Sequence, residues 1–576
     1  MELIQRAKEL NLIDDKILMP NVRQIEWYNR EKMIFFHFGM NTFTGKEWGD
    51  GTESPSTFNP SELCVEQWIK IIKEAGFKCA ILTAKHHDGF CLWQTKYTEH
   101  SIKNSPYKDG KGDIVAEFTS ACNKHGIKAG IYLSPWDRHE KTWGKDEYND
   151  FYVGQLTELL SNYGKIWEVW WDGAGSTEAV YDWERWAKTV KSLAPDATIF
   201  GSLGATPFVD VRWVGNEKGI AGKPCYATID KHSLVVETTS ELNSGKVNGN
   251  SFIPAEVDVS IRPGWFYHAE QDNEVRTPQN LMRLWFTSNG SNAGLLLNLP
   301  PDKRGLVHEN DERSLLEFSR NLSLAFENNL LKNAKITFNN INPLCNASSV
   351  LSDDKDFVAP CNGKEIELEI ELENEVEFNA VIIREGIEIG HRVVDFELFA
   401  DINGEKRLLI YGNCIGYRRA EHINKVKTRR LYFRTKGSLS TPVITFIGVY
   451  MLKDEYLNEE PRKARGSVLD GVSVIERGKD FFDINFGGVK EFNYVRVNGA
   501  LNGEYTLYVF NGTSFDKLKR AKATDGVLEI NLEKSIDYAY RIKICAPICE
   551  NATVQVLNKY KTHYSGTIMA ENKKTI

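Results

Sequence analysis

The sequence contains no apolar run that approaches the length of a membrane span. Its first residues, MELIQRAKELNLIDDK, carry acidic and polar side chains where a signal peptide needs an apolar core. These two absences favour a cytoplasmic protein. A secreted protein trimmed of its signal would have the same sequence, so that alternative stays open.

Basic residues are neither in excess nor clustered. The net charge is −8 over 576 residues, and Lys and Arg form no stripe along the chain. Proteins that bind nucleic acid or anionic membranes need a basic face, because the phosphate groups they contact are negatively charged. We therefore expect neither partner.

Signals for disulfides and metals are also missing. The ten cysteines have no framework spacing, and Cys79 and Cys91 lie in or beside apolar runs, which favours buried free thiols. No H-E-x-x-H or other dense ligand motif occurs. His86 and His87 are adjacent, so on a regular strand they would point to opposite faces. We predict neither a metal nor a cofactor.

What the sequence does contain is an alternation of strand-like and helix-like segments through about residue 330. Apolar residues recur at helical spacing from Val65, from Tyr152 and from Leu315. Such alternation predicts a parallel sheet, and eight strands predict a (β/α)₈-like barrel of the α/β class, with short or absent helices after the fifth and sixth strands. The eight predicted strands are Lys32–Thr42, Cys79–His87, Ile127–Pro135, Ile166–Asp172, Thr198–Leu203, Val211–Glu217, Phe252–Ile261 and Ala293–Leu299.

Reactive side chains stand at the ends of these strands. In this fold the carboxyl ends of the strands build the active site. One such histidine alone is more often a core residue than a catalyst, but the repetition on successive strands indicates a site. The residues are His37, His86, His87, Tyr132, Asp172, Glu217, and Glu256 with Asp258.

Two carboxyl groups beside His, Tyr and Trp side chains suit glycoside hydrolysis, in which one attacks the anomeric carbon and the other protonates the leaving oxygen. Asp172 is the candidate nucleophile because it shares a strand face with Trp170 and is followed by a glycine. For the acid/base we prefer Glu217, which ends its apolar run. Glu256 is expected to lie deeper, with Arg262 as a partner that would keep its pKa too low for an acid.

At these positions the sequence resembles the α-L-fucosidases of glycoside hydrolase family 29. The resemblance rests on FFHFGMNTFTGKEWGDG, LTAKHHDGFCLW, YLSPWD and WWDGA, and the run GNE followed by VDVSIRPGWFYH resembles the branch selective for α-1,3- and α-1,4-linked fucose. It implies a two-step retaining mechanism without a cofactor, with Asp172 as nucleophile, Glu217 as acid/base and Trp265 as an apolar wall for the C6 methyl group. The fucose pocket that it implies comprises His37, Glu47, Trp48, His86, His87, Tyr132 and Trp170.

After about Leu331 short alternating segments replace the helical spacing, which predicts β-sandwich domains. We expect a barrel over 1–333, a β-sandwich over 334–456 and a second small β-domain over 457–576. The first sandwich resembles a discoidin-like module in the stretches IREGIEIGHRVVDFEL, YGNCIGYRR, LYFRTKG and ITFIGVYM. The charged run EEPRKARG, 459–466, is a candidate linker.

Three functions remain open at this point: an α-L-fucosidase, a retaining glycosidase of other specificity, and a non-catalytic carbohydrate-binding protein. The expected partner is a fucosylated oligosaccharide, and the sequence favours no oligomeric state.

Overall fold

The computed structural model describes residues 2–174, 179–231, 239–353, 356–458, 474–477, 480–510, 515–546 and 548–557. Their contacts form two compact units, and the boundary between the two lies between Leu457 and Asn458. Among these residues, no helix combines the length and the apolar character that a membrane crossing requires.

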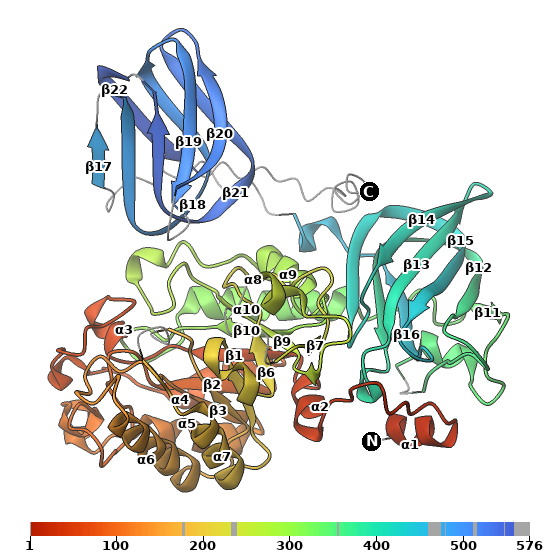
Figure 1. Cartoon of the computed structure of the whole chain (residues 1–576), viewed down its shortest axis with the longest axis horizontal. Coiled ribbons are helices and arrows are strands. Elements are labelled where there is room, and N and C mark those ends of the chain that lie inside the picture. Colours follow the sequence, from red (N-terminus) through yellow and green to blue (C-terminus); the bar gives the residue numbers. More distant parts are fainter. Residues whose placement is uncertain are drawn as a thin grey trace. The chain divides into compact units, whose positions relative to one another are not determined.

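The first unit contains a closed barrel of eight parallel strands (Figure 1). Around the barrel the order is β1-β10-β9-β6-β5-β4-β3-β2. Each of the eight predicted strands contains one of them, so the predicted barrel is confirmed. The strands are β1 (Lys32–Phe36), β2 (Cys79–Lys85), β3 (Lys128–Leu133), β4 (Glu168–Trp170), β5 (Thr198–Gly201), β6 (Val211–Trp213), β9 (Ala255–Ser260) and β10 (Gly294–Asn298).

Helices surround the strands, and their ends follow from local sequence. Asp113 accepts a hydrogen bond from the Ala116 N–H at the start of α5, and Gly126, at φ 72°, ends that helix in the left-handed conformation. Thr277 and Pro278 begin α9 in the same manner, with a side-chain cap and a proline in the first turn. The helices of the barrel are α4 (Val65–Glu74), α5 (Ile114–His125), α6 (Glu147–Asn162), α7 (Trp183–Leu193), α9 (Pro278–Thr287) and α10 (Glu309–Ala325).

The alternation weakens on one side of the barrel, as the sequence predicts. A 3₁₀ turn, Leu203–Phe208, follows β5, and the described residues between β6 and β9 form a two-stranded sheet and one short helix. These elements are β7 (Thr228–Ile229), α8 (Thr239–Ser244) and β8 (Ser251–Phe252). Three more short helices lie nearer the N-terminus: α1 (Glu2–Glu9), α2 (Val22–Tyr28) and α3 (Met40–Thr44).

Neighbouring residues on a barrel strand belong to different cores. Trp170 packs in the barrel interior with Phe35 and Phe200, whereas Trp171 packs between the strands and the helices, beside Trp186. Because side chains alternate along a strand, the residues that share a face with Trp170 are the ones that line the barrel interior near the carboxyl ends of the strands.

The rest of the first unit is an antiparallel six-stranded sheet with its own core. β12 and β15 are long and pair along their length, with register shifts between Glu371 and Val376 and between Phe378 and Ala380. β12 also pairs with β11 near its start and with β16 near its end. A two-residue hairpin loop joins Ile402 to Glu405, in which Asn403 and Gly404 have φ of 56° and 82°. The strands are β11 (Lys335–Phe338), β12 (Glu367–Glu385), β13 (Val393–Ile402), β14 (Glu405–Gly412), β15 (Arg419–Ser438) and β16 (Ile444–Tyr450).

Partly buried polar contacts join this sheet to the barrel. The Arg418 guanidinium lies 2.8 Å from a carboxylate oxygen of Glu31, and the amide oxygen of Asn292 accepts the Tyr417 N–H at 2.7 Å. Lys223 pairs with Glu421 at 2.9 Å. These contacts explain why the two segments share one compact unit.

The second unit is a separate antiparallel sheet in the order β17-β18-β21-β19-β20, with β22 paired to β18. It has its own apolar core, which confirms a further β-domain near the C-terminus. The run EEPRKARG lies outside the described residues. The strands are β17 (Val474–Arg477), β18 (Phe481–Ala500), β19 (Gly503–Phe510), β20 (Phe515–Ala523), β21 (Val527–Cys545) and β22 (Ile548–Leu557).

The barrel interior is packed tightly enough to require a glycine at Gly294, where a Cβ atom would overlap the Trp27 indole ring. Overpacking of this kind costs about 1–3 kcal/mol, so we expect Gly294→Ala to lower the free energy of unfolding by that amount. Gly437→Ala is the matched control, because its Cβ would make ordinary contacts at 3.5 Å with Asp395 and Val394. Equal melting temperatures for the two variants would contradict the prediction.

Candidate active site

Asp172 lies two residues beyond the end of β4, inside a set of hydrogen-bond donors. One carboxylate oxygen accepts the Tyr132 hydroxyl at 3.0 Å and lies 3.6 Å from Nε2 of His87. The other accepts the backbone N–H of Ala174 at 2.8 Å. These contacts hold the carboxylate in one orientation.

His37 is fixed as a neutral ring by Asn298, the last residue of β10. The Asn298 amide nitrogen donates to Ser260 Oγ at 2.9 Å and to the Trp265 carbonyl at 2.8 Å, which leaves its oxygen to face Nδ1 of His37 at 2.9 Å. Nδ1 therefore carries the proton and Nε2 keeps a free lone pair. Burial lowers the pKa of His37 to about 3, so Nε2 is a hydrogen-bond acceptor.

His86 has the opposite tautomer. The Asn41 amide nitrogen donates to the Glu47 carbonyl at 3.1 Å and faces Nδ1 of His86 at 3.3 Å. Nδ1 is therefore the acceptor, and Nε2 carries the proton. Burial holds the pKa of His86 well below its ordinary value. The His37 and His86 rings lie 5.6 Å apart, so one pocket contains both an imidazole acceptor and an imidazole donor.

His87 joins the same pocket because β2 ends at Lys85, before the strand alternation would separate the two histidines. The centroids of the adjacent rings are 4.0 Å apart. Ser134 donates its hydroxyl proton to the Trp136 carbonyl at 2.6 Å and accepts from Nδ1 of His87 at 2.7 Å. Burial lowers the pKa of His87, and the charge of Asp172 opposes that shift.

Glu47, Trp48 and Trp265 reach the pocket from two loops that are far apart in the sequence. Glu47 accepts the backbone N–H of Trp265 at 2.9 Å through one oxygen and binds Nε2 of His268 at 2.6 Å through the other. The Trp265 ring lies 5.0 Å from the ring of His37. Trp48 is 57% exposed, and its ring meets His87 edge-on at 5.8 Å.

Glu217 lies at the rim of the barrel. The predicted strand ran through this residue, but β6 ends at Trp213, and Glu217 stands four residues further along in a loop. Its carboxylate accepts the indole N–H of Trp265 at 3.2 Å. Although the side chain is exposed to solvent, protein atoms around the carboxyl group raise its pKa, and the charges of Asp172 and Glu47 raise it further. A raised pKa is what a general acid needs.

Glu256 lies below the pocket and is fully buried. Its two oxygens accept the indole N–H groups of Trp170 and Trp27, each at 3.0 Å. The predicted partnership with Arg262 is wrong, because Arg262 follows the strand and binds Asp311 of α10 instead. The pKa of Glu256 is not lowered but raised well above its ordinary value, first by burial and then by the charge of Glu168.

Asp258 follows Glu256 by two residues on β9 and is a further buried carboxyl group. It accepts the indole N–H of Trp213 at 2.8 Å. Burial raises its pKa well above the ordinary value, and the charge of Glu217 is the next cause. Asp258, Glu217 and Asp172 are therefore close enough to influence one another electrostatically.

Several residues that fix the pocket were not predicted from the sequence. Asn298 could have been found, because it is a polar residue at the end of a buried strand. Asn41, Ser134 and His268 could not, since each acts through a partner placed by the fold.

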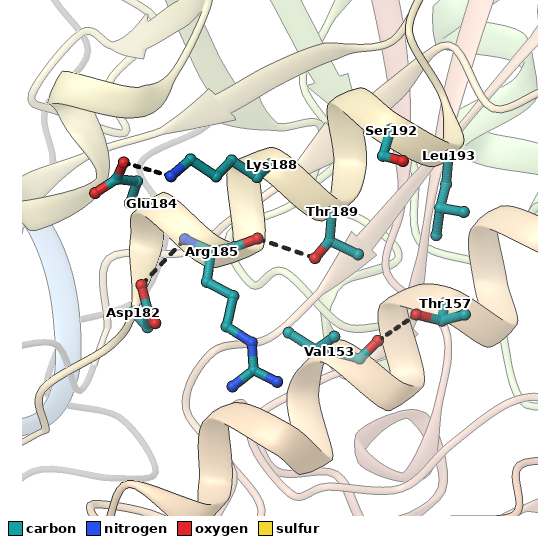
Figure 2. A pocket seen from close by; sticks show the side chains of 9 residues that line it. All are labelled: Val153, Thr157, Asp182, Glu184, Arg185, Lys188, Thr189, Ser192 and Leu193. Atoms are coloured by element: carbon teal, nitrogen blue, oxygen red, sulfur yellow. Dashed lines mark hydrogen bonds and ion pairs between the residues drawn. The ribbon is translucent and has the colours of Figure 1, made fainter.

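The described residues contain no candidate metal site, and one surface hollow lies elsewhere on the barrel. No group of His, Cys, Asp and Glu side chains in the described ranges could hold a metal ion. A surface hollow of about 630 Å³ lies between α6 and α7, away from the strand ends (Figure 2). Its charged side chains already bind partners, as Lys188 does with Glu184 at 2.7 Å and Arg185 with Asp150 at 2.6 Å.

Residues 18–325 match the family model of the α-L-fucosidases, a span that covers the barrel and every site residue described above. The chain belongs to the α-L-fucosidase family, glycoside hydrolase family 29. Of the three functions left open by the residues alone, this membership supports the first and makes the chain a glycoside hydrolase.

Relatives of this fucosidase chain are similar over most of their length. Alpha-L-fucosidase 1 of Arabidopsis thaliana is 40% identical over 76% of this chain and 88% of the relative. The crystal structure of a putative α-L-fucosidase from Bacteroides thetaiotaomicron has a TM-score of 0.74 and 41% identity, over 76% of this chain and 98% of that one. A Ruminococcus gnavus family 29 fucosidase in complex with fucose has a TM-score of 0.71 and 32% identity, over 77% and 97%.

His268 and Glu47 form a hydrogen-bonded pair whose charge depends on pH. The hydrogen bond to Glu47 raises the pKa of His268, Glu270 at 3.9 Å adds to the rise, and burial and Lys303 oppose it. The charged pair is therefore complete below the ordinary pKa of histidine and is lost as the pH rises through the raised value. We expect KM for an aryl fucoside to increase over that range, because Glu47 loses its charged partner and is held less firmly in the pocket.

In His268→Gln a neutral donor replaces the charged one, so this rise should disappear and KM at low pH should increase roughly 5-fold, for about 1 kcal/mol. Steady-state kinetics across pH measure both effects. His125→Gln is the matched control, since His125 binds Glu66 at 3.1 Å outside the pocket. Identical pH profiles of KM for the wild type and His268→Gln would contradict the prediction.

Proposed function

We propose that this enzyme removes α-1,3- and α-1,4-linked fucose from branched oligosaccharides by a two-step retaining mechanism, with Asp172 as nucleophile and Glu217 as acid/base. The observation that carries the catalytic part is the contrast between the two carboxyl groups. Asp172 is surrounded by the donors of Tyr132 and Ala174, whereas the pKa of Glu217 is raised at the mouth of the barrel.

In the first step an oxygen of Asp172 bonds to the anomeric carbon, while Glu217 gives its proton to the glycosidic oxygen and the acceptor sugar leaves. In the second step Glu217 takes a proton from water, whose oxygen bonds to the anomeric carbon and releases Asp172. Two displacements at the same carbon retain its configuration. Tyr132 holds the attacking carboxylate in place through both steps.

The remaining pocket residues are proposed to bind the sugar. His37 supplies an acceptor and His86 a donor, so they suit two different hydroxyl groups, and His87, Glu47, Trp48 and Trp170 complete the polar and apolar lining. Trp265 is proposed as the wall for the C6 methyl group, because its ring packs against the pocket histidine His37 while its indole N–H holds Glu217.

Loss of each carboxyl group should leave a different kinetic signature. Asp172→Gly should lower kcat by several powers of ten, because no covalent intermediate can form. Glu217→Ala should lose far more activity on natural oligosaccharides than on an aryl fucoside whose leaving group needs no proton, and azide should partly restore its turnover. Steady-state rates on both substrate types measure the difference.

More than about a tenth of native activity in Asp172→Gly would remove Asp172 from the mechanism. NMR of the first-formed product provides an independent check on the stereochemistry, since retention requires α-fucose. Thermal unfolding of each variant separates lost chemistry from lost folding.

The linkage preference rests on the motifs GNE and VDVSIRPGWFYH. We expect kcat/KM for trisaccharides in which fucose and galactose share one N-acetylglucosamine to exceed that for α-1,2-linked fucosides by at least about 10-fold, or ~1.4 kcal/mol. The physical reason is that binding energy from the unreacting galactose lowers the barrier at the fucose. Faster cleavage of the α-1,2-linked substrates would overturn the preference while leaving the fucosidase mechanism intact.

A further inference from the structure

Below the pocket, the barrel interior holds a column of polar groups that the reaction does not use. Arg30 donates from Nη1 to a carboxylate oxygen of Glu168 at 2.5 Å, and both side chains are almost completely buried. Glu256 lies next to Glu168 and completes the column upward to the indole N–H groups of Trp27 and Trp170.

The charges in this column do not balance unless one carboxyl group is protonated. Burial raises the pKa of Glu168 to about 7 despite Arg30, and it also raises the pKa of Glu256 well above its ordinary value. One cation faces two carboxyl groups, and two buried carboxylates side by side cannot both remain ionised. Because Arg30 donates to Glu168, the charge stays on Glu168 and the proton on Glu256. Oε1 of Glu168 has no hydrogen-bond partner in the described part of the chain and is available to accept that proton's hydrogen bond.

Trp170 depends on this arrangement for its orientation. Its ring stacks on Phe200, with centroids 4.1 Å apart and an interplanar angle of 8°, and contacts Tyr132 at 5.5 Å. Stacking allows an aromatic ring to slide or flip at small cost, whereas a hydrogen bond from a buried indole fixes it. Among the residues that the structure describes, Glu256 is the acceptor of this N–H, at 3.0 Å.

We propose that Glu256 is a positioning residue, which fixes the Trp170 indole and through it the floor of the sugar pocket beside Tyr132 and Asp172. Asp172 follows Trp170 by two residues, and Tyr132, which donates to Asp172, packs against the Trp170 ring. A shift of Trp170 therefore displaces both the sugar and the carboxylate that attacks it. The inference rests on the proposed function in that it places the pocket around Asp172.

Glu256→Gln tests the proposal, because it preserves shape but changes the hydrogen bonds. The amide has one acceptor oxygen and one donor nitrogen, so it cannot accept both indole N–H groups while its nitrogen faces Glu168. Misplacement of a pocket wall by about 1 Å costs up to about 100-fold, and we expect kcat/KM to fall about 10- to 100-fold. The loss should be equal for aryl fucosides with good and poor leaving groups, and azide should not restore activity.

Two double variants separate positioning from a general loss of stability. In Glu256→Gln/Trp27→Phe the second indole donor is gone, so the amide oxygen is free for Trp170, and activity should recover to within about 3-fold of Trp27→Phe alone. In Glu256→Gln/Trp170→Phe the hydrogen bond is already absent, so kcat/KM should equal that of Trp170→Phe. Melting temperatures of all five variants are measured alongside.

Additive losses in both double variants would overturn the proposal, since they would show that Glu256 acts independently of Trp170. A loss that grows with leaving-group pKa and responds to azide would instead make Glu256 the acid/base. An active Asp172→Gly variant would refute the proposed mechanism, yet the coupling between Glu256 and Trp170 would still be measurable. The two failures are therefore distinguishable.

Discussion

Closure of the eight-stranded parallel sheet is the constraint on which the site depends. Because the strands are parallel, their carboxyl ends meet at one rim, and residues separated by more than 200 positions become neighbours there. His37 and Asn298 illustrate this, since hydrogen bonding across adjacent strands β1 and β10 places them 2.9 Å apart. The loops after β1 and β9 then close over the rim through the contacts of Glu47 with Trp265 and His268.

In the proposed sugar pocket, the hydrogen-bonding groups have fixed roles before any sugar enters. Two asparagines determine the tautomers of two neutral histidines, and each asparagine is itself oriented by a backbone carbonyl that can only accept. Burial prevents either histidine from charging. A sugar entering this pocket meets an acceptor and a donor whose positions need no rearrangement, which reduces the cost of binding.

The carboxyl groups of the barrel differ in their surroundings because they lie at different depths below its rim. At the rim, Glu217 is reached by solvent and feels the charges of Asp172 and Glu47. Inside, Glu256 accepts two indole N–H groups and is influenced by the neighbouring carboxyl groups of Glu168 and Asp258. Depth in the barrel therefore separates a group suited to proton exchange with substrate and water from one suited to holding an aromatic ring.

The sequence by itself determined the barrel, the antiparallel β-domains and most of the residues at the rim. Hydrophobic periodicity is a local property, and strand-end residues such as His37, His86, Tyr132 and Asp172 follow directly from it. Even the Asn403–Gly404 hairpin could be predicted, because positive φ at both positions is a property of those two residues. The family motifs within the first 300 residues added the type of chemistry.

Only the tertiary structure decided which groups are partners. Arg262 is the nearest arginine to Glu256 along the chain, yet it binds Asp311, and Glu256 binds Trp27 and Trp170 from α2 and β4. The tautomers of His37 and His86 likewise depend on contacts with other strands and loops. Periodicity states which face a side chain takes, but a hydrogen bond and a pKa depend on what the folded chain brings opposite that face.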